Sequence, residues 1–328
     1  MTIESILLLK PYIMILFKKI TLIGVLTFVY VGFLYAQDTE TEDKKQEEVK
    51  KEKPRVVRNA FASSIMLEHQ TVLTPKAKTL VLNMQHRFGK LWSGNGFDLL
   101  GFFANGANIR IGLEYAIIDN LQIGFGTEKN HLAQDFNVKW SILQQRKGTM
   151  PIFLTAYADV AIEAGKNENY MSGGEYKPGH RFSYYYELMI ARKFHKRFTL
   201  QLSASYSHFN VVDNTTAFTY ETTGFEVMRD AKLDNVAVSA LARIKASPQT
   251  SVILGYDQTL TPAKQDFQLN YPYNLSVGVE IATSAHSFQI FVGNRNGILG
   301  QYNMAQNGFD FTKGDFILGF NITRLWGL

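Results

Sequence analysis

The chain has 328 residues, of which 46% are hydrophobic, 13% aromatic and only 19% charged, and it contains 25 glycines and 8 prolines. This composition is typical of a β-rich protein with many turns. The lack of cysteine excludes disulfides, thiolate metal sites and a catalytic cysteine, as expected for a protein that folds outside the cytoplasm without disulfides. The net charge of +5 includes no Lys/Arg-rich run of the kind that tracks nucleic acid, so no nucleic-acid partner is expected.

The first 36 residues have the features of a secretory signal peptide. Lys18 and Lys19 precede the apolar run ITLIGVLTFVYVGFLYA, in which Leu34 and Ala36 occupy suitable cleavage positions. Residues upstream of Met14 would make the charged region unusually long, so Met14 is the expected translation start. A transmembrane anchor is the alternative, but no apolar stretch of bilayer-spanning length recurs after Ala36.

Residues 37–54, QDTETEDKKQEEVKKEKP, are dense in charge and contain no aromatic side chain. Such a segment cannot bury a core, so we expect a disordered linker, with a charged helix as the alternative. Residues 55–78 are predicted to form a periplasmic lead-in. Within them, residues 59–74 are short and mixed in polarity, and an extra strand or a small plug are the alternatives.

Residues 79–328 are predicted to form an all-β, closed antiparallel transmembrane barrel. Apolar residues recur at every second position in segments that match the roughly ten residues a tilted strand needs to cross a bilayer. Twelve strands are expected, and a count between ten and fourteen is compatible with the pattern. The segments are residues 79–88, 108–118, 121–126, 135–142, 151–162, 181–191, 198–209, 235–245, 251–258, 273–282, 287–294 and 315–326.

The links between these segments alternate in length. The links after the first, fifth, seventh, ninth and eleventh segments are long, whereas those after even-numbered segments are short. The link near His131, after the third segment, is short where a long one is expected. Short turns at one end and longer loops at the other are typical of outer-membrane barrels. The pattern places both chain ends, and the Asp119-Asn120 turn, at the periplasmic rim.

The two faces of the strands differ in charge. One parity, which includes Ile109, Ile111 and Phe320, carries almost no formal charge. A charge at the lipid midplane costs about 2 to 4 kcal/mol, so this parity is predicted to face lipid and the other the lumen. Unpaired strand edges are costly in lipid, which requires closure. The candidate lumen-lining residues are Arg87, Arg110, Glu114, Glu128, Lys139, Asp159, Arg181, Glu187, Arg243, Lys245, Asp257 and Glu280.

Two stretches, FASSIMLEHQTVLTPKAKTLVLNMQHRFG and GANIRIGLEYAIIDNLQIGFG, resemble a family of outer-membrane β-barrel proteins from Bacteroidetes-type bacteria, known as a domain of unknown function. The shared features are the HRFG of residues 86–89, the GANIR of residues 106–110, and the spacing of Gly112, Tyr115, Asp119, Ile123 and Gly124 around the hairpin. The resemblance implies a fold and a membrane location, and it carries no activity.

Catalytic and metal-binding patterns are not evident in the sequence. None of the seven histidines falls in an HExxH or comparable ligand spacing. The stretch YSHFN at residues 206–210 is similar to the outer wall of outer-membrane phospholipase A, but Asn210 stands where that enzyme has its serine nucleophile. We therefore expect no catalytic residue, no metal and no cofactor.

The expected function is that of an outer-membrane channel, transporter or structural partner, without enzymatic activity. Its expected partners are outer-membrane lipid, a small polar solute and the outer-membrane assembly machinery, since a final strand ends the chain. The lumen charges could line a selective pore, or could neutralise one another and fill a narrow barrel. The alternatives are a closed-lumen barrel for surface binding or assembly, an outer-membrane lipid hydrolase and a soluble periplasmic lipid carrier.

Overall fold

The computed structural model describes residues 55–93, 98–104, 106–172, 175–211, 234–261, 273–305 and 309–328. The predicted signal peptide of residues 1–36, the predicted start at Met14 and the predicted linker of residues 37–54 lie outside the described residues. Parts of the long links between strands lie outside them as well.

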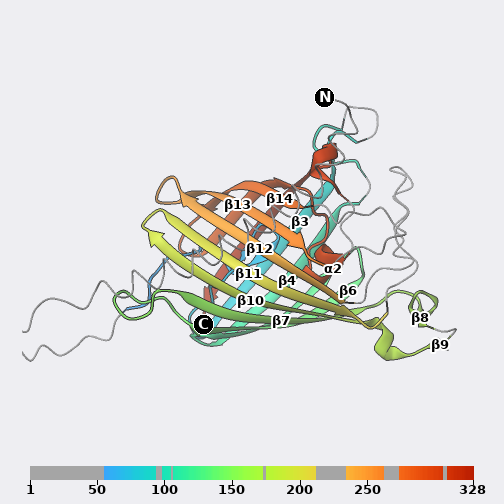
Figure 1. Ribbon diagram of the computed structural model, residues 1–328, viewed down its shortest axis with the longest axis horizontal. Helices are drawn as coiled ribbons and strands as arrows, with labels where there is room; N and C mark the ends of the chain where they lie inside the picture. The colour runs from blue at the N-terminus through green and yellow to red at the C-terminus, as the bar shows by residue number, and fades with distance from the viewer. Residues whose placement is uncertain are drawn as a thin grey trace, which may run out of the picture. The chain divides into compact units, whose positions relative to one another are not determined.

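Twelve long strands form a closed antiparallel barrel, shown in Figure 1. The strand that closes the wall is the last one, which pairs with the first so that Asn321 lies opposite Gln85. The prediction of a closed, twelve-stranded antiparallel barrel is confirmed. The strands, in order around the wall, are β3 (Thr79–Lys90), β4 (Asn108–Ile118), β5 (Leu121–Glu128), β6 (Ala133–Leu143), β7 (Phe153–Glu163), β10 (Phe182–His195), β11 (Phe198–Phe209), β12 (Asp234–Lys245), β13 (Thr250–Thr259), β14 (Asn274–Ala282), β15 (His286–Gly293) and β16 (Ile317–Gly327).

Burial alternates along each strand in the way the sequence predicts. In β4, Ile111 and Leu113 are exposed on the outer surface, whereas Arg110 and Glu114 are only 2% exposed. In β15, Ile290 is 63% exposed and its neighbour Gln289 is buried. An outer surface rich in exposed aliphatic and aromatic side chains is the arrangement expected where a barrel wall meets lipid.

Short elements occupy the links of the barrel. The link between β7 and β10 contains η1 (Asn167–Tyr170), β8 (Met171–Ser172), β9 (Glu175–Tyr176) and η2 (Pro178–Arg181), and the link before β16 contains α2 (Gly300–Ala305) and η3 (Phe311–Lys313). Within the described part of the chain, no helix is both long and apolar enough to span a membrane.

The segment before β3 lies inside the barrel. It contains two short paired strands, β1 (Ile65–Met66) and β2 (His69–Gln70), and most of residues 60–72 are buried. The expectation of a lead-in outside the barrel is wrong for this part of residues 55–78. The plug that the sequence left as an alternative is the observed arrangement, because the polar side chains of this hairpin are matched by polar groups on the inner wall.

Candidate functional site

Ten of the twelve predicted lumen residues are buried inside the barrel. Arg110 forms a two-pronged ion pair with Asp135, in which Nε lies 2.8 Å from Oδ1 and Nη2 lies 2.5 Å from Oδ2. Across the lumen, on the inner face of β12 and β14, Arg243 Nε donates to Oε2 of Glu280 at 2.6 Å. The ten buried residues are Arg87, Arg110, Glu114, Glu128, Lys139, Asp159, Glu187, Arg243, Asp257 and Glu280.

The other two predicted lumen residues lie near the ends of the barrel and are less buried. Arg181 ends η2 in the link before β10, where its guanidinium donates to the carbonyl oxygens of Glu163 and Gly165. Lys245 is the last residue of β12, at the short-turn end, and is only partly buried. Lys245 keeps the face of the buried Arg243, whereas Arg181 precedes β10 and therefore lies outside the alternation of a strand.

Inward glycines make room for the buried arginine. A Cβ at Gly126 of β5 would lie 2.5 Å from both Arg110 Nη2 and Asp135 Oδ1, and a Cβ at Gly112 would lie 2.7 Å from Arg110 Nη1. Contacts under 3 Å are closer than packed atoms allow, so the guanidinium can lie flat against the wall only because these positions lack side chains.

The N-terminal insert, residues 60–73, enters and leaves through the short-turn end of the barrel. At that end Val57 N donates to the carbonyl of Gln145, and Ala77 N donates to Oδ1 of Asp119 in the turn between β4 and β5. Between these two anchors the chain forms the β1–β2 hairpin, whose tip is Leu67 and Glu68. The insert therefore occupies the lumen as a hairpin open toward the short turns.

The inner wall binds the main chain of the insert through polar side chains. Gln289 Oε1 accepts from Leu67 N at 3.0 Å, and Asn321 Nδ2 and Arg87 Nη2 donate to Leu67 O at 2.8 and 3.2 Å. Lys139 Nζ donates to the carbonyl of Ser64 at 2.9 Å. Gln201 accepts a hydrogen bond from Val72 N through Oε1 and donates one to Gln70 O through Nε2. The wall side chains thus replace the partners that an isolated hairpin would find in water.

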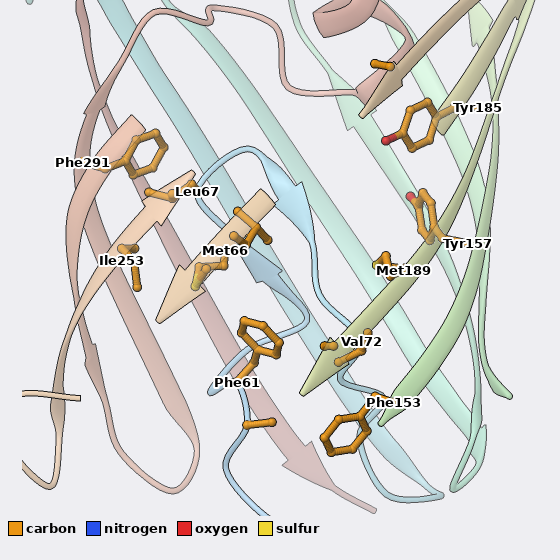
Figure 2. Close-up of a cluster of buried hydrophobic side chains, with 14 of the residues drawn as sticks. Phe61, Met66, Leu67, Val72, Phe153, Tyr157, Tyr185, Met189, Ile253 and Phe291 are labelled. Carbon is orange, nitrogen blue, oxygen red and sulfur yellow. The ribbon is translucent and has the colours of Figure 1, made fainter. Parts of the chain in front are cut away.

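Apolar residues of the insert also pack against an apolar patch of the inner wall (Figure 2). Phe61, Met66, Leu67 and Val72 of the insert belong to one buried cluster. The prediction of a wet, charged lumen is incomplete, because the inward face of the wall supplies apolar partners to this cluster. Its members from the wall are Phe153, Tyr157, Tyr185, Met189, Ala191, Ala237, Leu241, Ile253 and Phe291.

Two ionisable residues at the tip of the insert pair with the wall. Glu68 Oε2 accepts from Ser276 Oγ at 2.9 Å, and His69 Nε2 lies 2.9 Å from Oδ2 of Asp257. Burial lowers the pKa of His69, but the carboxylates of Asp257, Glu68 and Glu187 outweigh burial and raise that pKa above its ordinary value. The charged imidazolium is therefore the form that stabilises the insert.

A second segment, residues 295–305, fills the lumen from the long-loop end, and we call it the loop insert. Tyr302 stacks on His131 with ring centroids 3.6 Å apart, and its hydroxyl donates to Oε1 of Glu163 at 2.7 Å. Gln301 Nε2 donates to Oδ1 of Asp159 at 3.0 Å. Burial and the nearby carboxylates raise the pKa of Tyr302 well above its ordinary value, so its hydroxyl stays a donor.

The two inserts leave little free space between them. The cavity at their junction has a volume of about 20 Å³ and is lined by Glu68, His69 and Gln70 of the N-terminal insert, by residues 298–301 of the loop insert, and by wall residues that include Arg110, Asp159 and Glu187. That volume suits about one water molecule. Among the described residues, no group of three or more His, Asp and Glu side chains is placed to hold a metal ion.

The YSHFN stretch lies at the long-loop end of β11. His208 Nδ1 lies 2.8 Å from Oδ1 of Asp234, and the hydroxyl of Tyr206 donates to the same oxygen. Ser207, which lies between Tyr206 and His208 in the sequence, is fully buried on the opposite face of the strand. The serine of the stretch therefore points away from the His208–Asp234 pair.

A protein-family model described as a membrane-bound beta barrel domain, DUF5777, matches residues 61–326. The chain belongs to this family. None of the curated proteins compared with it matches. Among solved structures, the barrel is similar to an outer-membrane channel from Pseudomonas putida, with 13% identity, a TM-score of 0.42 and coverage of 77% of this chain and 97% of that one. It is also similar to the NanC porin (7% identity, TM-score 0.42, 76% and 99% coverage) and the KdgM porin (6% identity, TM-score 0.42, 74% and 98% coverage).

The residues that fill the lumen of this protein lie in the two inserts, and the two-residue alternation of the strands does not identify them. Glu68, His69 and Gln70 lie in a hairpin with strands of two residues each, and Gln301 and Tyr302 lie in a helix of six residues. Segments this short carry no period that could be measured along the sequence. One signal was available, because residues 59–74 mix apolar and polar side chains too evenly for an exposed linker.

Proposed function

We propose that the protein is a bacterial outer-membrane channel or transporter for a small polar solute, held closed by its N-terminal insert. The membrane-bound barrel, the apolar outer surface and the predicted signal peptide support the outer membrane as its location. The assignment to a Bacteroidetes-type bacterium stays a prediction from the sequence resemblance.

The observation that carries the proposal is the polar binding of the insert. Arg87, Lys139, Gln201, Gln289 and Asn321 all direct their hydrogen bonds to its main chain. Each such bond contributes only about 0.5 to 1.5 kcal/mol net, because water can replace it. A wall built only to be filled would cost less free energy if it were apolar throughout, since polar groups lose solvation on burial. Polar wall groups suit a lumen that is also wetted.

The second candidate is a permanently closed barrel that serves as a membrane anchor for its loops. The apolar cluster between the insert and the wall favours it, because Leu67, Met66 and Phe61 are at most 2% exposed and would have to enter water on release. The balance between this cluster and the replaceable polar contacts decides between the two candidates.

Thiol labelling distinguishes them, because the chain has no natural cysteine. We would place a single cysteine at Ser64, which is 2% exposed within the insert, and follow its reaction with a membrane-impermeant maleimide in cells and in proteoliposomes. A channel that opens exposes this thiol and reacts over time. The matched control is a cysteine at Glu175, an exposed loop position that should react at once.

Conductance in planar bilayers completes the test. We expect a low current with brief openings from the full chain, and sustained current from a variant in which a flexible linker replaces residues 60–73. A folded full chain whose Ser64→Cys thiol never reacts, and which passes no current, would establish the closed-barrel candidate instead.

A further inference from the structure

The cavity at the junction of the two inserts is surrounded by oxygen atoms that lack donors. The Oε1 atoms of Glu68, Gln70, Glu187 and Gln301 are inaccessible to solvent and accept no hydrogen bond from the described residues. All four residues line the same cavity. The residues that carry three of these atoms are more than nine-tenths buried, with exposures of 7% for Glu68, 4% for Glu187 and 0% for Gln301.

In Glu68, Glu187 and Gln301, the other polar atom of the carboxylate or amide group is held by a hydrogen bond, so the unpartnered oxygen cannot turn away. Glu68 Oε2 accepts from Ser276 Oγ at 2.9 Å, and Glu187 Oε2 accepts from the Tyr185 hydroxyl at 3.1 Å. Gln301 holds Asp159 through its amide nitrogen at 3.0 Å, which leaves its carbonyl oxygen free. Buried acceptors without donors cost free energy, and proteins satisfy nearly all of them.

The carboxyl groups around the cavity outnumber the cations of its lining that are free to donate to them. Glu68, Asp159 and Glu187 contribute three carboxyl groups. The two cations of the lining are already committed, because Arg110 binds Asp135 and His69 binds Asp257.

Two further wall cations lie outside the lining. Arg87 and Lys139 direct their hydrogen bonds to main-chain carbonyls of the N-terminal insert, at Leu67 and Ser64. These two cations donate no hydrogen bond to the unpartnered oxygens, so the lining keeps more acceptor oxygens than donors.

We propose that this cavity binds a small monovalent cation through the unpartnered oxygens of Glu68, Gln70, Glu187 and Gln301. Ligands that are all oxygen suit a hard cation and not zinc or copper. Arg87 acts electrostatically on Glu68, and Lys139 acts on Glu187, so the negative charge left for a bound ion is less than that of two full carboxylates and suits a single positive charge. The small volume suits an ion without a full hydration shell.

Such a cation would join three elements that are distant in sequence. Glu68 and Gln70 belong to the N-terminal insert, Gln301 belongs to the loop insert and Glu187 belongs to β10 of the wall. Binding that needs all three elements in place stabilises the filled lumen over any state in which one insert has left. The site stands whether or not the lumen opens as a channel.

The test is thermal unfolding of the full chain in detergent, with choline chloride replaced by NaCl or KCl at constant ionic strength. We expect a saturable rise in Tm with Na⁺ or K⁺ in the wild type, and about 100-fold slower labelling of Ser64→Cys at a concentration 100 times the Kd. The rise should be lost in Glu68→Gln and in Glu187→Gln. The matched control is Glu128→Gln, which removes a buried carboxylate outside the cavity and should keep the response.

Three outcomes would overturn the proposal. The first is an identical Tm in choline, sodium and potassium chloride, which would mean that the cavity holds only water. The second is a response to CaCl₂ or MgCl₂ without a response to Na⁺ or K⁺. The third is an unchanged response in both Glu68→Gln and Glu187→Gln. The wild-type titration needs no variant and no current, so it remains decisive if a variant fails to fold or if the barrel does not conduct.

Discussion

Replacing Leu67 by alanine should release the N-terminal insert from the lumen without unfolding the barrel. Leu67 is completely buried at the tip of the hairpin, where it packs against Gly255 of β13, and a Cβ at that glycine would lie 2.9 Å from Leu67 Cδ1. It shares its apolar cluster with Ile253 and Phe291. A buried Leu→Ala change costs about 2 to 5 kcal/mol, because contacts are lost and the cavity collapses only in part.

The backbone at this position makes alanine the informative replacement. Leu67 has φ 58°, in the left-handed region, where a residue with a Cβ is disfavoured by about 1 to 2 kcal/mol. The hydrogen bonds of Gln289, Arg87 and Asn321 to its main chain hold it there. Alanine keeps this backbone cost, so the change reports the packing of the side chain alone. Glycine would relieve the strain and obscure the result.

The assay is the labelling rate of Ser64→Cys combined with Leu67→Ala. If reclosing is faster than labelling, the rate follows the population of the released insert. A loss of 2 to 5 kcal/mol then speeds labelling by about 30-fold to a few thousand-fold, at roughly 1.4 kcal/mol per factor of ten. Leu188→Ala, at an exposed outer position of β10, should leave the rate unchanged. An unchanged rate in folded Leu67→Ala would refute the view that this side chain anchors the insert.

Three further predictions concern the wall, the insert and the lipid face. Asp135→Asn removes the ion-pair partner of the buried Arg110 guanidinium, and should destabilise the barrel by about 3 to 5 kcal/mol in urea unfolding. The raised pKa of His69 means that its ion pair with Asp257 stabilises the insert fully below about pH 6.5 and is lost as pH rises through the folded-state pKa. Labelling of Ser64→Cys, normalised to an exposed cysteine, should therefore accelerate with pH. Ile290→Arg should cost about 2 to 4 kcal/mol of folding free energy in lipid bilayers, because Ile290 lies midway along β15 on the outer surface.

Each of these predictions has a matched comparison. Combining Asp135→Asn with Arg110→Met should recover much of the lost stability, and no recovery would contradict the ion-pair argument. His69→Gln should abolish the pH dependence of labelling, so a persistent dependence would assign it to another group. Ile290→Leu should fold normally in lipid, and equal folding of Ile290→Arg would show that this face does not meet the membrane core.

The wall of the barrel was predictable because its signal is local. In β4, the alternation of Ile111 and Leu113 with Arg110 and Glu114 fixes which face each side chain takes, since neighbours in a strand point to opposite sides. The expected and observed strands differ only at their ends. Two predicted lumen residues also lie at these ends: Arg181 just before β10, and Lys245 at the last position of β12.

The contents of the lumen were not predictable in the same way, because contacts between distant residues determine them. Leu67 N binds Gln289, 222 residues away, and Leu67 O binds Asn321, 254 residues away. A hairpin of two-residue strands has no period of its own, so the sequence could name a plug only as an alternative. The inward apolar residues Met189, Leu241 and Ile253 mark where such a plug would pack, since a wetted lumen has no use for them.

The two inserts share contacts, and this makes their release interdependent. Met304 of the loop insert belongs to the same apolar cluster as Leu67, and the cavity at their junction is lined by both segments. When the N-terminal insert leaves, the loop insert loses apolar partners but keeps the hydrogen bonds of Gln301 and Tyr302 to the wall. Release from the short-turn end therefore leaves a weakened closure at the long-loop end. If the protein is the channel proposed above, a solute path needs both segments to move, and the shared cluster makes the second movement easier once the first has occurred.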